Sequence, residues 1–328
     1  MLDKYAITAS GLEKFYGING KTLQRHYKHR LSDFKTWDQR SHAQKYLLYP
    51  ENIGPYLSLD ETALSNGELF TILTNKAKGG KKGSIVAMVR GTRSEDIIPI
   101  FHKIPDYKRR KVKEVTLDMA AGMNLVVKKC FTKATRVTDR FHVQKLAFDA
   151  VQDLRIKHRW EALDEENEQY AQAKKAGKKY MPIVFTNGDT RKQLLARSRY
   201  LLFKASSKWT TSQAIRAQIL FEEYPDIEKA YKLAMELASI YHQTNSKGVA
   251  FTKMARWFDK VEKSGFASFY TIRKTFETHY EFILNYFDNR STNASAESFN
   301  SKIKDFRRAF RGVTDLDFFL FRLTNIFA

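Results

Sequence analysis

Three neighbouring runs decide the fold, and they are YLSLDET (56–62), ELFTILTNKAK (68–78) and GSIVAMVRGTR (83–93). Each run is rich in apolar and β-branched residues, which are typical of strands. Turn signals separate them, namely SNG (65–67) and KGGKKG (78–83). Strands joined by short glycine-containing turns predict an antiparallel meander.

After the meander, strand-like and helix-like runs alternate. The apolar residues of EDIIPIFHKI (95–104) recur at helical spacing. The three runs that follow are typical of a strand, a helix and a strand: KEVTLDMAAG (113–122), MNLVVKKCF (123–131) and TRVTDRFHV (135–143). Such alternation requires parallel strand pairs, because each helix crosses over between two strands. The sequence therefore predicts an α/β fold with a mixed sheet.

The strand pattern then disappears, and the chain becomes Lys-rich and helical in period, as in EALDEENEQYAQAKKAGKKY (161–180). We interpret this stretch as an all-helical insertion. The later run STNASAESFNSKIKDFRRAFRGV (291–313) predicts a capped helix that begins at Ser291 or Thr292 and ends at Gly312. The expected units are a small basic helical N-terminal segment, two parts of the α/β domain and the insertion between them: 1–50, 51–143 with 291–328, and 144–290.

The composition points to a polyanionic partner. The chain has 328 residues and is 43% hydrophobic, so it can bury a full core, and its net charge is +21 with a pI near 9.8. Nucleic acid is the simplest such partner, since ribosomal or membrane-surface proteins of this charge are usually shorter. The single cysteine, Cys130, excludes an internal disulfide or a cysteine-based zinc ribbon. Without an apolar span or a signal-peptide core, we expect a cytoplasmic protein close to the nucleoid and no membrane partner.

Two acids follow apolar strand residues in the same way. Asp60 in YLSLDET and Asp118 in KEVTLDMAAG are each expected near the end of a strand. Each could simply bond the next turn, but burying a carboxylate without a partner costs several kcal/mol. If the two strands are neighbours, these residues lie about 5 Å apart, which is a metal-bridging distance.

A third acid opens the helix predicted near residue 291. Asn300 and Lys304 follow Glu297 by three and seven residues, so the three side chains fall on one face of the helix. The packing side is formed by apolar residues, namely Phe299, Ile303 and Phe306. Glu297 could be an ordinary solvated residue. Its phase instead places a carboxylate, an amide and a cation together.

Such acids suit phosphodiester chemistry. Two Mg²⁺ or Mn²⁺ ions about 3.5 to 4 Å apart can activate the attacking oxygen and stabilise the leaving oxygen. Hard cations of this kind take carboxylate oxygens and water as ligands, and need neither His nor Cys. Asp60, Asp118 and Glu297 are the candidate metal ligands.

Four motifs carry a wider resemblance: LSLDET (57–62), VTLDMAAGM (115–123), VTDRFHVQKLAFDAV (137–151) and STNASAESFNSKIK (291–304). In them the chain resembles the DDE transposases of bacterial insertion sequences, within the ISL3 family. The resemblance implies a ribonuclease-H-like catalytic domain interrupted by the helical insertion. It also implies that Asp60, Asp118 and Glu297 are the catalytic, metal-binding acids.

The D-R-F-H block adds two near-site residues, Asp139 and His142, to Asn300 and Lys304. The resemblance implies that they orient DNA or the metal ligands. Otherwise, Asp139 caps a turn and His142 packs in the sheet. The strand of Asp139 should lie beside that of Asp118, so Asp139 is also an alternative metal ligand.

Basic residues outside these motifs are candidates for DNA contacts. The segment GLEKFYGINGKTLQRHYKHRLSDF (11–34) reads as helix, glycine turn and helix, either a helix-turn-helix or a basic hairpin packed on the core. The expected DNA-binding residues are Lys21, Gln24, Arg25, Lys28, Lys81, Lys82, Arg109, Arg110, Arg197 and Arg199. Trp160, Trp209 and Trp257 of the insertion are either core residues or platforms for an unpaired base.

The resemblance implies a transposase that cleaves transposon ends with metal ions and joins the freed 3′-hydroxyl to target DNA. It would act as a homo-oligomer on double-stranded transposon ends and target. Family members usually begin with a cysteine-rich zinc segment and a helix-turn-helix; the zinc segment is not found here, so either a separate protein or the shorter N-terminal segment would recognise the ends. Two alternatives stay open: a structure-selective nuclease with the same metal core, and a non-catalytic DNA-binding protein from a domesticated element.

Overall fold

The computed structural model describes residues 1–65, 67–310 and 312–328. Asn66, in the SNG turn signal, lies outside these residues. Backbone contacts divide the chain into two compact units, residues 1–139 with 289–328 and residues 140–288. The sequence placed the start and end of the insertion at 144 and 290. Residues 1–50 belong to the first unit.

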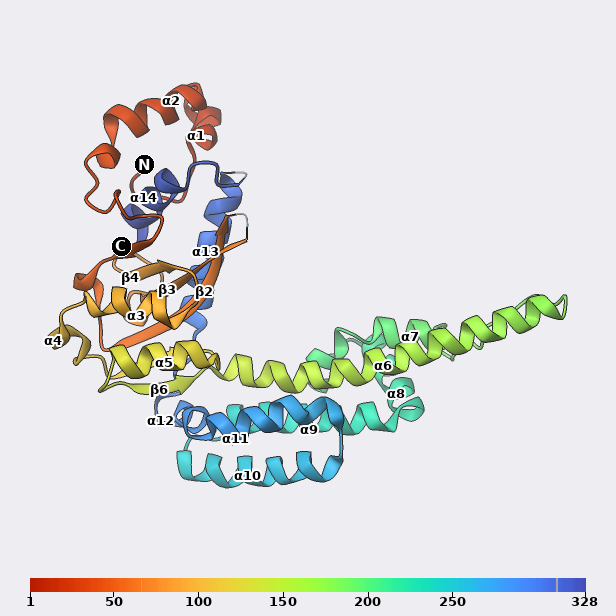
Figure 1. Cartoon of the computed structure of the whole chain (residues 1–328). Helices are drawn as coiled ribbons and strands as arrows, with labels where there is room; N and C mark the ends of the chain where they lie inside the picture. Colours follow the sequence, from red (N-terminus) through yellow and green to blue (C-terminus); the bar gives the residue numbers. More distant parts are fainter. Residues whose placement is uncertain (66, 311) are drawn as a thin grey trace. The chain divides into compact units, whose positions relative to one another are not determined.

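The first unit is built on one six-stranded mixed sheet, which bears out the predicted α/β class (Figure 1). Its strands are β1 Tyr46–Leu48, β2 Tyr56–Ser65, β3 Glu68–Asn75, β4 Ile85–Arg90, β5 Glu114–Leu117 and β6 Thr135–Thr138. Their order is β1-β4-β3-β2-β5-β6. The predicted meander is present as β2, β3 and β4, which pair antiparallel, while β5 and β6 continue parallel to β2.

One face of the sheet is covered by α3 (Ser94–His102) and α5 (Ala121–Cys130), with the short α4 (Asp106–Arg109) between them in sequence (Figure 1). Alternate residues of two strands belong to this apolar core, namely Leu57 and Leu59 of β2 and Val115 and Leu117 of β5. Because strand side chains alternate, the residues between them, including Ser58 and Asp60, point to the other face.

The other face is covered by α13 (Ala294–Ala309) and α14 (Leu316–Phe327). Phe299, Ile303 and Phe306 are buried there, which confirms the predicted packing side of α13. The helix begins after Asn293, slightly later than predicted. The amide of Gly312 donates to the carbonyl of Arg307 at 3.3 Å, so the chain turns where the glycine predicted a stop.

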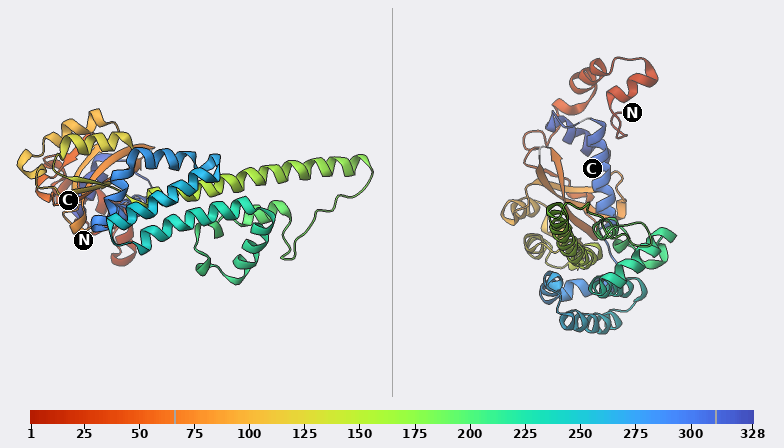
Figure 2. Two further views of the ribbon diagram at one scale, coloured as in Figure 1. Left: turned by 90° about the horizontal axis from the view of Figure 1, so that it is seen from below. Right: turned by 90° about the vertical axis from the view of Figure 1, so that its right-hand side faces the viewer.

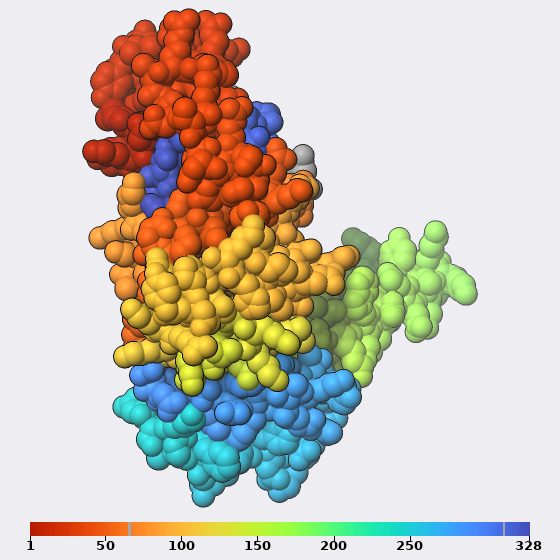
Figure 3. Space-filling model, turned by 60° about the vertical axis from the view of Figure 1, so that its left-hand side comes forward, coloured from red at the N-terminus to blue at the C-terminus, as the bar shows by residue number. Residues whose placement is uncertain are grey.

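The N-terminal segment packs on α14. It comprises α1 (Ala9–Tyr16), α2 (Gly20–His26), a π-helical turn (Tyr27–Leu31) and a 3₁₀ turn (Asp33–Lys35). Phe34 and Tyr27 lie against Phe318, and the buried Arg322 donates to backbone carbonyls of this segment. The space-filling view shows these red residues against the blue C-terminal segment (Figure 3). The helical hairpin is thus tied to the first unit.

The second unit consists mainly of helices. They are α6 (Arg140–Lys175), α7 (Arg191–Arg197), α8 (Thr211–Glu223), α9 (Pro225–Gln243), α10 (Lys247–Ser264) and α11 (Tyr270–Leu284), and α12 (Tyr286–Asn289) spans its end. Helices α9 and α11 run alongside α6 (Figure 2). Short 3₁₀ turns lie at Leu201–Phe203, Ser206–Lys208 and Ala267–Phe269, and in the first unit at Pro50–Asn52 and Lys76–Lys78. None of the helices in the described ranges is long and apolar enough to cross a membrane.

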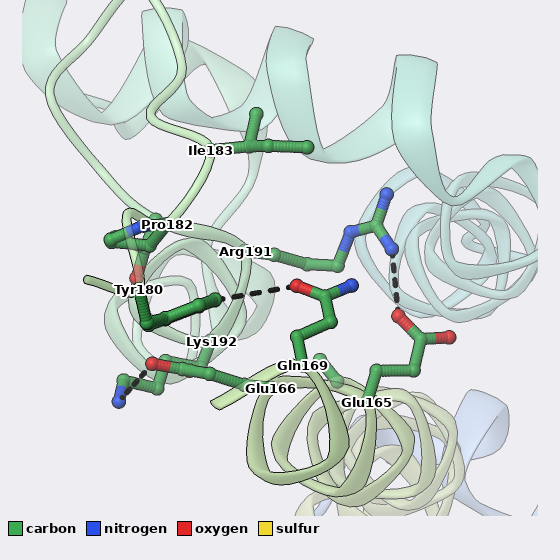
Figure 4. Close-up of a pocket in the computed structure, with 10 residues that line it drawn as sticks. Glu165, Glu166, Gln169, Tyr180, Pro182, Ile183, Arg191 and Lys192 are labelled. Atoms are coloured by element: carbon green, nitrogen blue, oxygen red, sulfur yellow. Dashed lines mark hydrogen bonds and ion pairs between the residues drawn. The ribbon is translucent and has the colours of Figure 1, made fainter. Parts of the chain in front are cut away.

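A long connector returns the chain from the end of α6 to α7. Figure 4 shows how the connector and the start of α7 are fastened to α6: Tyr180 of the connector donates to Gln169 at 3.5 Å, and Arg191 and Lys192 of α7 pair with Glu165 at 2.9 Å and Glu166 at 2.8 Å. The cavity beneath these pairs is only about 50 Å³, enough for water but not for a nucleotide. These contacts therefore hold the connector and do not form a ligand site.

The sequence misplaced one strand end. TRVTDRFHV (135–143) was predicted to be a strand throughout, but β6 ends at Thr138 and α6 begins at Arg140. Val143, Ala147 and Val151 are buried at a spacing of four, which is the period of a helix and not of a strand. The helical pattern therefore starts several residues earlier than expected.

Candidate metal centre

Three carboxylates occupy matching register positions at three adjacent strands of the sheet. Ser58 of β2 pairs with Thr116 of β5, so two residues further Asp60 and Asp118 follow in the same register. Leu117 pairs with Thr138 of β6, so Asp118 and Asp139 are the next positions on these strands. Asn300 of α13 contacts Asp60 and the backbone of Asn293, which precedes α13, contacts Asp139, so both acids lie on the face that α13 covers, and Asp118 occupies the register position between them.

Asp60 is held by α13. Its Oδ2 accepts a hydrogen bond from Nδ2 of Asn300 at 2.7 Å, and its Oδ1 accepts one from the Glu61 amide at 2.8 Å. The sequence expected Asp60 near a strand end, whereas β2 continues to Ser65. Only the parallel pairing with β5 ends before Asp60, since β3 remains paired beyond it.

Asp118 is the first residue after β5 and is half-buried. Its Oδ1 accepts the amide of Ala120 at 2.9 Å, which is the turn contact that the sequence allowed as an alternative role. Burial first, and then the charges of Asp118 and Asp60, raise the pKa of Glu61. Negative charge is therefore concentrated around these two strands.

Asp139 is the most buried of the acids, with 1% of its surface exposed. Its Oδ1 accepts the amide of Asn293 at 3.3 Å. Its Oδ2 has no hydrogen-bond partner among the described residues, and neither do the side-chain oxygen and nitrogen of the buried Asn293. An unpaired buried carboxylate oxygen is costly unless a cation or water meets it.

Glu297 lies in the first turn of α13 and is exposed. Carboxylate oxygens of Glu297 and Asp139 lie within 4.8 Å of each other, close enough to share one ion. In the described part of the chain, Asp60 and Asp118 belong to no group of three potential ligands at that spacing. The sequence predicted that Glu297 would share metal ions with Asp60 and Asp118, whereas in the structure its near carboxylate neighbour is Asp139.

A buried ion pair lies on the same face of β5. Nζ of Lys76 is 3.3 Å from Oε1 of Glu114 and also bonds Thr116, and Asn289 donates to the other oxygen of Glu114 at 3.1 Å. Burial lowers the pKa of Lys76, while the Glu114 carboxylate and, more weakly, the charge of Asp139 act to raise it. Lys76 therefore pairs with Glu114 and lies close enough to Asp139 for the two charges to interact.

Cations continue along α13 beyond the acids. Lys304 is exposed, and with Arg307, Arg308 and Gly312 it lines an open cavity of about 380 Å³. Arg307 donates to the carbonyl of Ala63 at 3.3 Å, whereas Arg308 pairs with Asp305 at 3.0 Å on the surface. His142 lies in the first turn of α6, in the second unit, and is half-buried.

The predicted DNA-binding residues divide into two groups. Four of them have charged or carbonyl partners within the chain: Lys28 pairs with Asp315, Arg109 donates to the carbonyls of Ile104 and Cys130, Arg110 pairs with Asp106, and Arg197 pairs with Asp189. The others are exposed, except for the half-buried Gln24: Lys21, Gln24, Arg25, Lys81, Lys82 and Arg199. Arg199 also lies over the ring of Tyr200.

The tryptophans of the insertion also differ. Trp257 is fully buried and donates to the Leu233 carbonyl, so it is a core residue. Trp160 is 60% exposed, and Trp209 is intermediate. Only the last two can meet a ligand.

Sequence reasoning missed Glu61, Lys76 and Asn293. Glu61 follows Asp60 directly, and an acid beside a candidate ligand was a usable signal. Asn293 lies inside the quoted STNASAESFNSKIK motif, but only the fold shows that its amide meets Asp139. Lys76 belongs to a lysine-rich loop that looked solvated, and no local pattern reveals its burial against Glu114.

The donor set is suited to hard divalent cations. It consists of carboxylate oxygens, with an amide holding one of them in place, and one buried oxygen lacks any partner in the described residues. Mg²⁺ and Mn²⁺ bind through one or two such carboxylates together with water. These acids therefore fit divalent ions of this kind.

Comparison with known proteins agrees with this chemistry. The profile of a transposase family, the ISL3 DDE transposases, matches residues 57–323. The transposase of the insertion sequence element IS1001 from Bordetella parapertussis is 22% identical over 275 residues. That alignment covers 83% of this chain but 61% of the relative, so the chain spans less than two thirds of that protein.

Proposed function

Since the chain belongs to the ISL3 family of DDE transposases, whose members use divalent metal ions, we propose that it cleaves transposon ends and joins the freed 3′-hydroxyl to target DNA. The observation that carries the proposal is that Asp60, Asp118 and Asp139 occupy matching register positions at three adjacent strands, where Asn300 of α13 contacts Asp60 and the backbone of Asn293 contacts Asp139. The chain's charge of +21 supports DNA as the substrate.

The sheet supports a ribonuclease-H-like catalytic core. Three antiparallel strands, β4, β3 and β2, are followed by the parallel strands β5 and β6, which is the strand order of that fold. β1 adds a further strand at the edge beside β4. In this arrangement, acids at the ends of parallel strands gather at one edge of the sheet.

Asp60, Asp118 and Glu297 are the proposed ligands of two Mg²⁺ or Mn²⁺ ions, with Asp139 as a fourth carboxylate beside Glu297. When bound, such ions lower the pKa of the attacking oxygen and offset the charge of the leaving oxygen. Asn300 fixes the orientation of Asp60 through its 2.7 Å hydrogen bond. The backbone N–H of Asn293 fixes the orientation of Asp139 through its 3.3 Å hydrogen bond.

Basic residues would hold the DNA backbone next to these acids. Lys304 lies two turns after Glu297 on α13, about 10 Å along the helix axis. Arg307 and Arg308 follow it around the 380 Å³ cavity. We assign phosphate binding to Lys304 and Arg307, since Lys304 has no ion-pair partner in the described chain and Arg307 bonds only a carbonyl, whereas Arg308 is paired with Asp305.

The reaction consists of two in-line displacements at phosphorus. In the first, a water oxygen attacks the phosphate at the transposon end, a proton is released, and the 3′-oxygen leaves as the free hydroxyl. In the second, that hydroxyl attacks a target phosphate, and the displaced strand leaves with its own 3′-oxygen. The first step hydrolyses one phosphodiester bond, and the second replaces one phosphodiester bond with another. Neither step requires a redox partner.

Recognition of the ends requires surfaces beyond the acids. Lys28 pairs with Asp315, whereas Lys21 and Arg25 on α2 have no ion pair in the described chain. These two residues and Gln24 therefore remain candidates for contacts with duplex DNA. A separate end-recognition protein is the alternative. Paired ends would require a homo-oligomer, as the resemblance implies.

The test is Asp118→Asn in the full chain, assayed with labelled transposon-end duplexes and Mg²⁺. We expect cleavage to fall by about 10³-fold, because several kcal/mol of charge stabilisation is lost, while DNA affinity changes less than about threefold. Asp96→Asn removes an exposed carboxylate from α3, on the opposite face of the sheet, and serves as the matched control with unchanged activity.

Unchanged cleavage by Asp118→Asn would overturn the catalytic assignment. A pre-cleaved end with a free 3′-hydroxyl separates the transposase from a nuclease with the same acids. The proposal requires that wild-type protein join this end to target DNA. Hydrolysis without joining would favour the nuclease.

A further inference from the structure

The second unit contains a groove that the proposed reaction does not use. It lies between the start of α6, the 3₁₀ turns Leu201–Phe203 and Ser206–Lys208, and the helices α8 and α9. Its volume is about 940 Å³, which is at the upper end of small-molecule sites and large enough for two or three nucleotides. All the lining residues belong to the second unit.

Aromatic rings form its floor. Trp209 lies 5.6 Å from Tyr231 and 6.2 Å from Phe221 between ring centroids, and Phe148 lies 5.7 Å from Phe203. Nε1 of Trp209 donates to the Leu201 carbonyl at 2.8 Å. The hydroxyl of Tyr231 likewise donates to the Lys204 carbonyl at 2.8 Å. The polar edges of both rings are thus bonded within the protein, and the groove offers ring surface.

The charges at the rim do not cancel. Glu228 pairs with Lys232 at 2.7 Å, and Glu236 pairs with Lys260 at 2.6 Å. Lys204 and Lys208 are exposed, and no ion pair holds either of them in the described chain. The excess charge of the groove is therefore positive, and it lies beside the aromatic floor.

We propose that this groove binds an unpaired DNA strand of two or three nucleotides. Bases would stack on Trp209 and the exposed ring of Phe203, and the ammonium groups of Lys204 and Lys208 would meet the phosphates. Every base offers a flat face, so such binding requires no particular sequence.

Other occupants fit the groove less well. The bases of intact duplex are stacked on one another, so duplex offers the rings nothing to bind. A second copy of the chain would bring a net charge of +21 toward two unpaired lysines. A neutral apolar segment would leave both lysines without a counter-charge.

The inference rests on the proposed function in one respect, that DNA is the partner, but it does not depend on catalysis. Binding of a labelled six-nucleotide oligothymidine to the full chain is measured in EDTA, beside a blunt duplex. Under these conditions Asp118→Asn should bind both probes as wild type does. Failure of the catalytic assignment would therefore leave this test intact.

Three variants address the groove. Trp209→Leu should weaken strand binding by about tenfold and abolish the quenching of tryptophan fluorescence by the strand, since a stacked base is lost. Phe203→Ala removes a ring that is 39% exposed, so it tests stacking with little risk to folding. Lys204→Glu with Lys208→Glu should weaken strand binding by about tenfold or more, owing to four units of changed charge.

Lys178→Glu with Lys179→Glu makes the same charge change on exposed residues outside the groove, and should weaken binding less than about threefold. Wild-type strand affinity in Phe203→Ala and in the Lys204 and Lys208 variant would overturn the proposal. Equal losses of strand and duplex binding would also overturn it, because they would indicate a general charge effect. A change of oligomeric state at unaltered strand affinity would show a protein interface instead.

Discussion

Each of the two units buries an aspartate, and the two are treated in opposite ways. Asp189, in the helical unit, has no exposed surface, and its oxygens bond Arg197 and Arg216. Asp139, in the α/β unit, is almost as buried, yet its Oδ2 has no partner in the described residues. In the helical unit two arginines neutralise the buried carboxylate, whereas in the α/β unit one oxygen of the buried carboxylate has no hydrogen-bond partner in the described residues and could accept a cation.

The difference separates stability from function. A buried carboxylate that two guanidinium groups satisfy contributes to folding and has no capacity left for a ligand. A buried carboxylate with an unpaired oxygen costs stability in the free protein. Folds keep such costly groups at sites where a ligand repays them.

Of the changes to the two buried aspartates, Asp139→Asn should have the largest effect on activity, and it should not lower stability. We expect transposon-end cleavage to fall by about 10²-fold or more, because a carboxylate beside Glu297 is lost. The unfolding free energy without metal should stay constant or rise by about 1 kcal/mol, since an unpaired buried charge is removed. Urea denaturation in EDTA, beside the cleavage assay, measures both. A clear loss of stability would show that Asp139 is structural.

Asp189→Asn should have the reverse effect. The unfolding free energy should fall by about 3 to 5 kcal/mol, because two arginines lose their buried partner. Although burial alone would raise the pKa of Asp189, hydrogen bonds from Arg216 and Arg197 hold it below its usual range. Its contribution is therefore present above a pH of about 4 and is lost as pH falls through the lowered pKa. Urea titrations at pH 7 and below pH 4 should show the wild-type advantage shrinking.

Divalent metal should stabilise wild type more than Asp139→Asn. With 10 mM Mg²⁺ and a dissociation constant of about 1 mM, binding to the folded state alone adds about 1.4 kcal/mol. Thermal unfolding with Mg²⁺ and with EDTA measures this difference, and Ca²⁺ serves as a control for a different coordination preference. Equal stabilisation of both proteins would show that Asp139 takes no part in holding the ion.

The smallest effect should separate the two arginines of Asp189. The Arg197 side chain is 55% exposed and that of Arg216 is 17% exposed. Arg197→Ala should therefore cost about 1 kcal/mol or less, since solvent screens an exposed pair. Arg216→Ala should cost more, and urea denaturation of the two variants provides the comparison. Equal costs would mean that exposure does not set the strength of these pairs.

Residue patterns within single elements predicted the strands of the meander and the buried side of α13. The meander and the packing side of α13 follow from residue alternation and helical phase, and the register of adjacent strands then brings Asp118 beside Asp139. The predicted strand of Asp60 was found, but its length was not foreseen, because pairing with β3 extends it.

Long-range partners could not be predicted in this way. Lys28 looked like a DNA contact until folding placed Asp315 beside it, 287 residues away in sequence. Asp189 lies in a connector where no period marks it as buried, and its arginines follow 8 and 27 residues later. Such partners are set by how elements pack, and one sequence carries no direct signal for that.

The contact between Asp139 and Asn293 also marks the two points where the chain leaves and rejoins the α/β unit. Everything between them is, for that unit, a loop whose ends are already fastened together. The entropy of closing a loop grows only slowly with its length, by about 0.6 kcal/mol for each doubling. Residues 140–288 could thus be shortened, lengthened or exchanged for another helical module during evolution while the acids kept their places, and we expect relatives to differ most in length there.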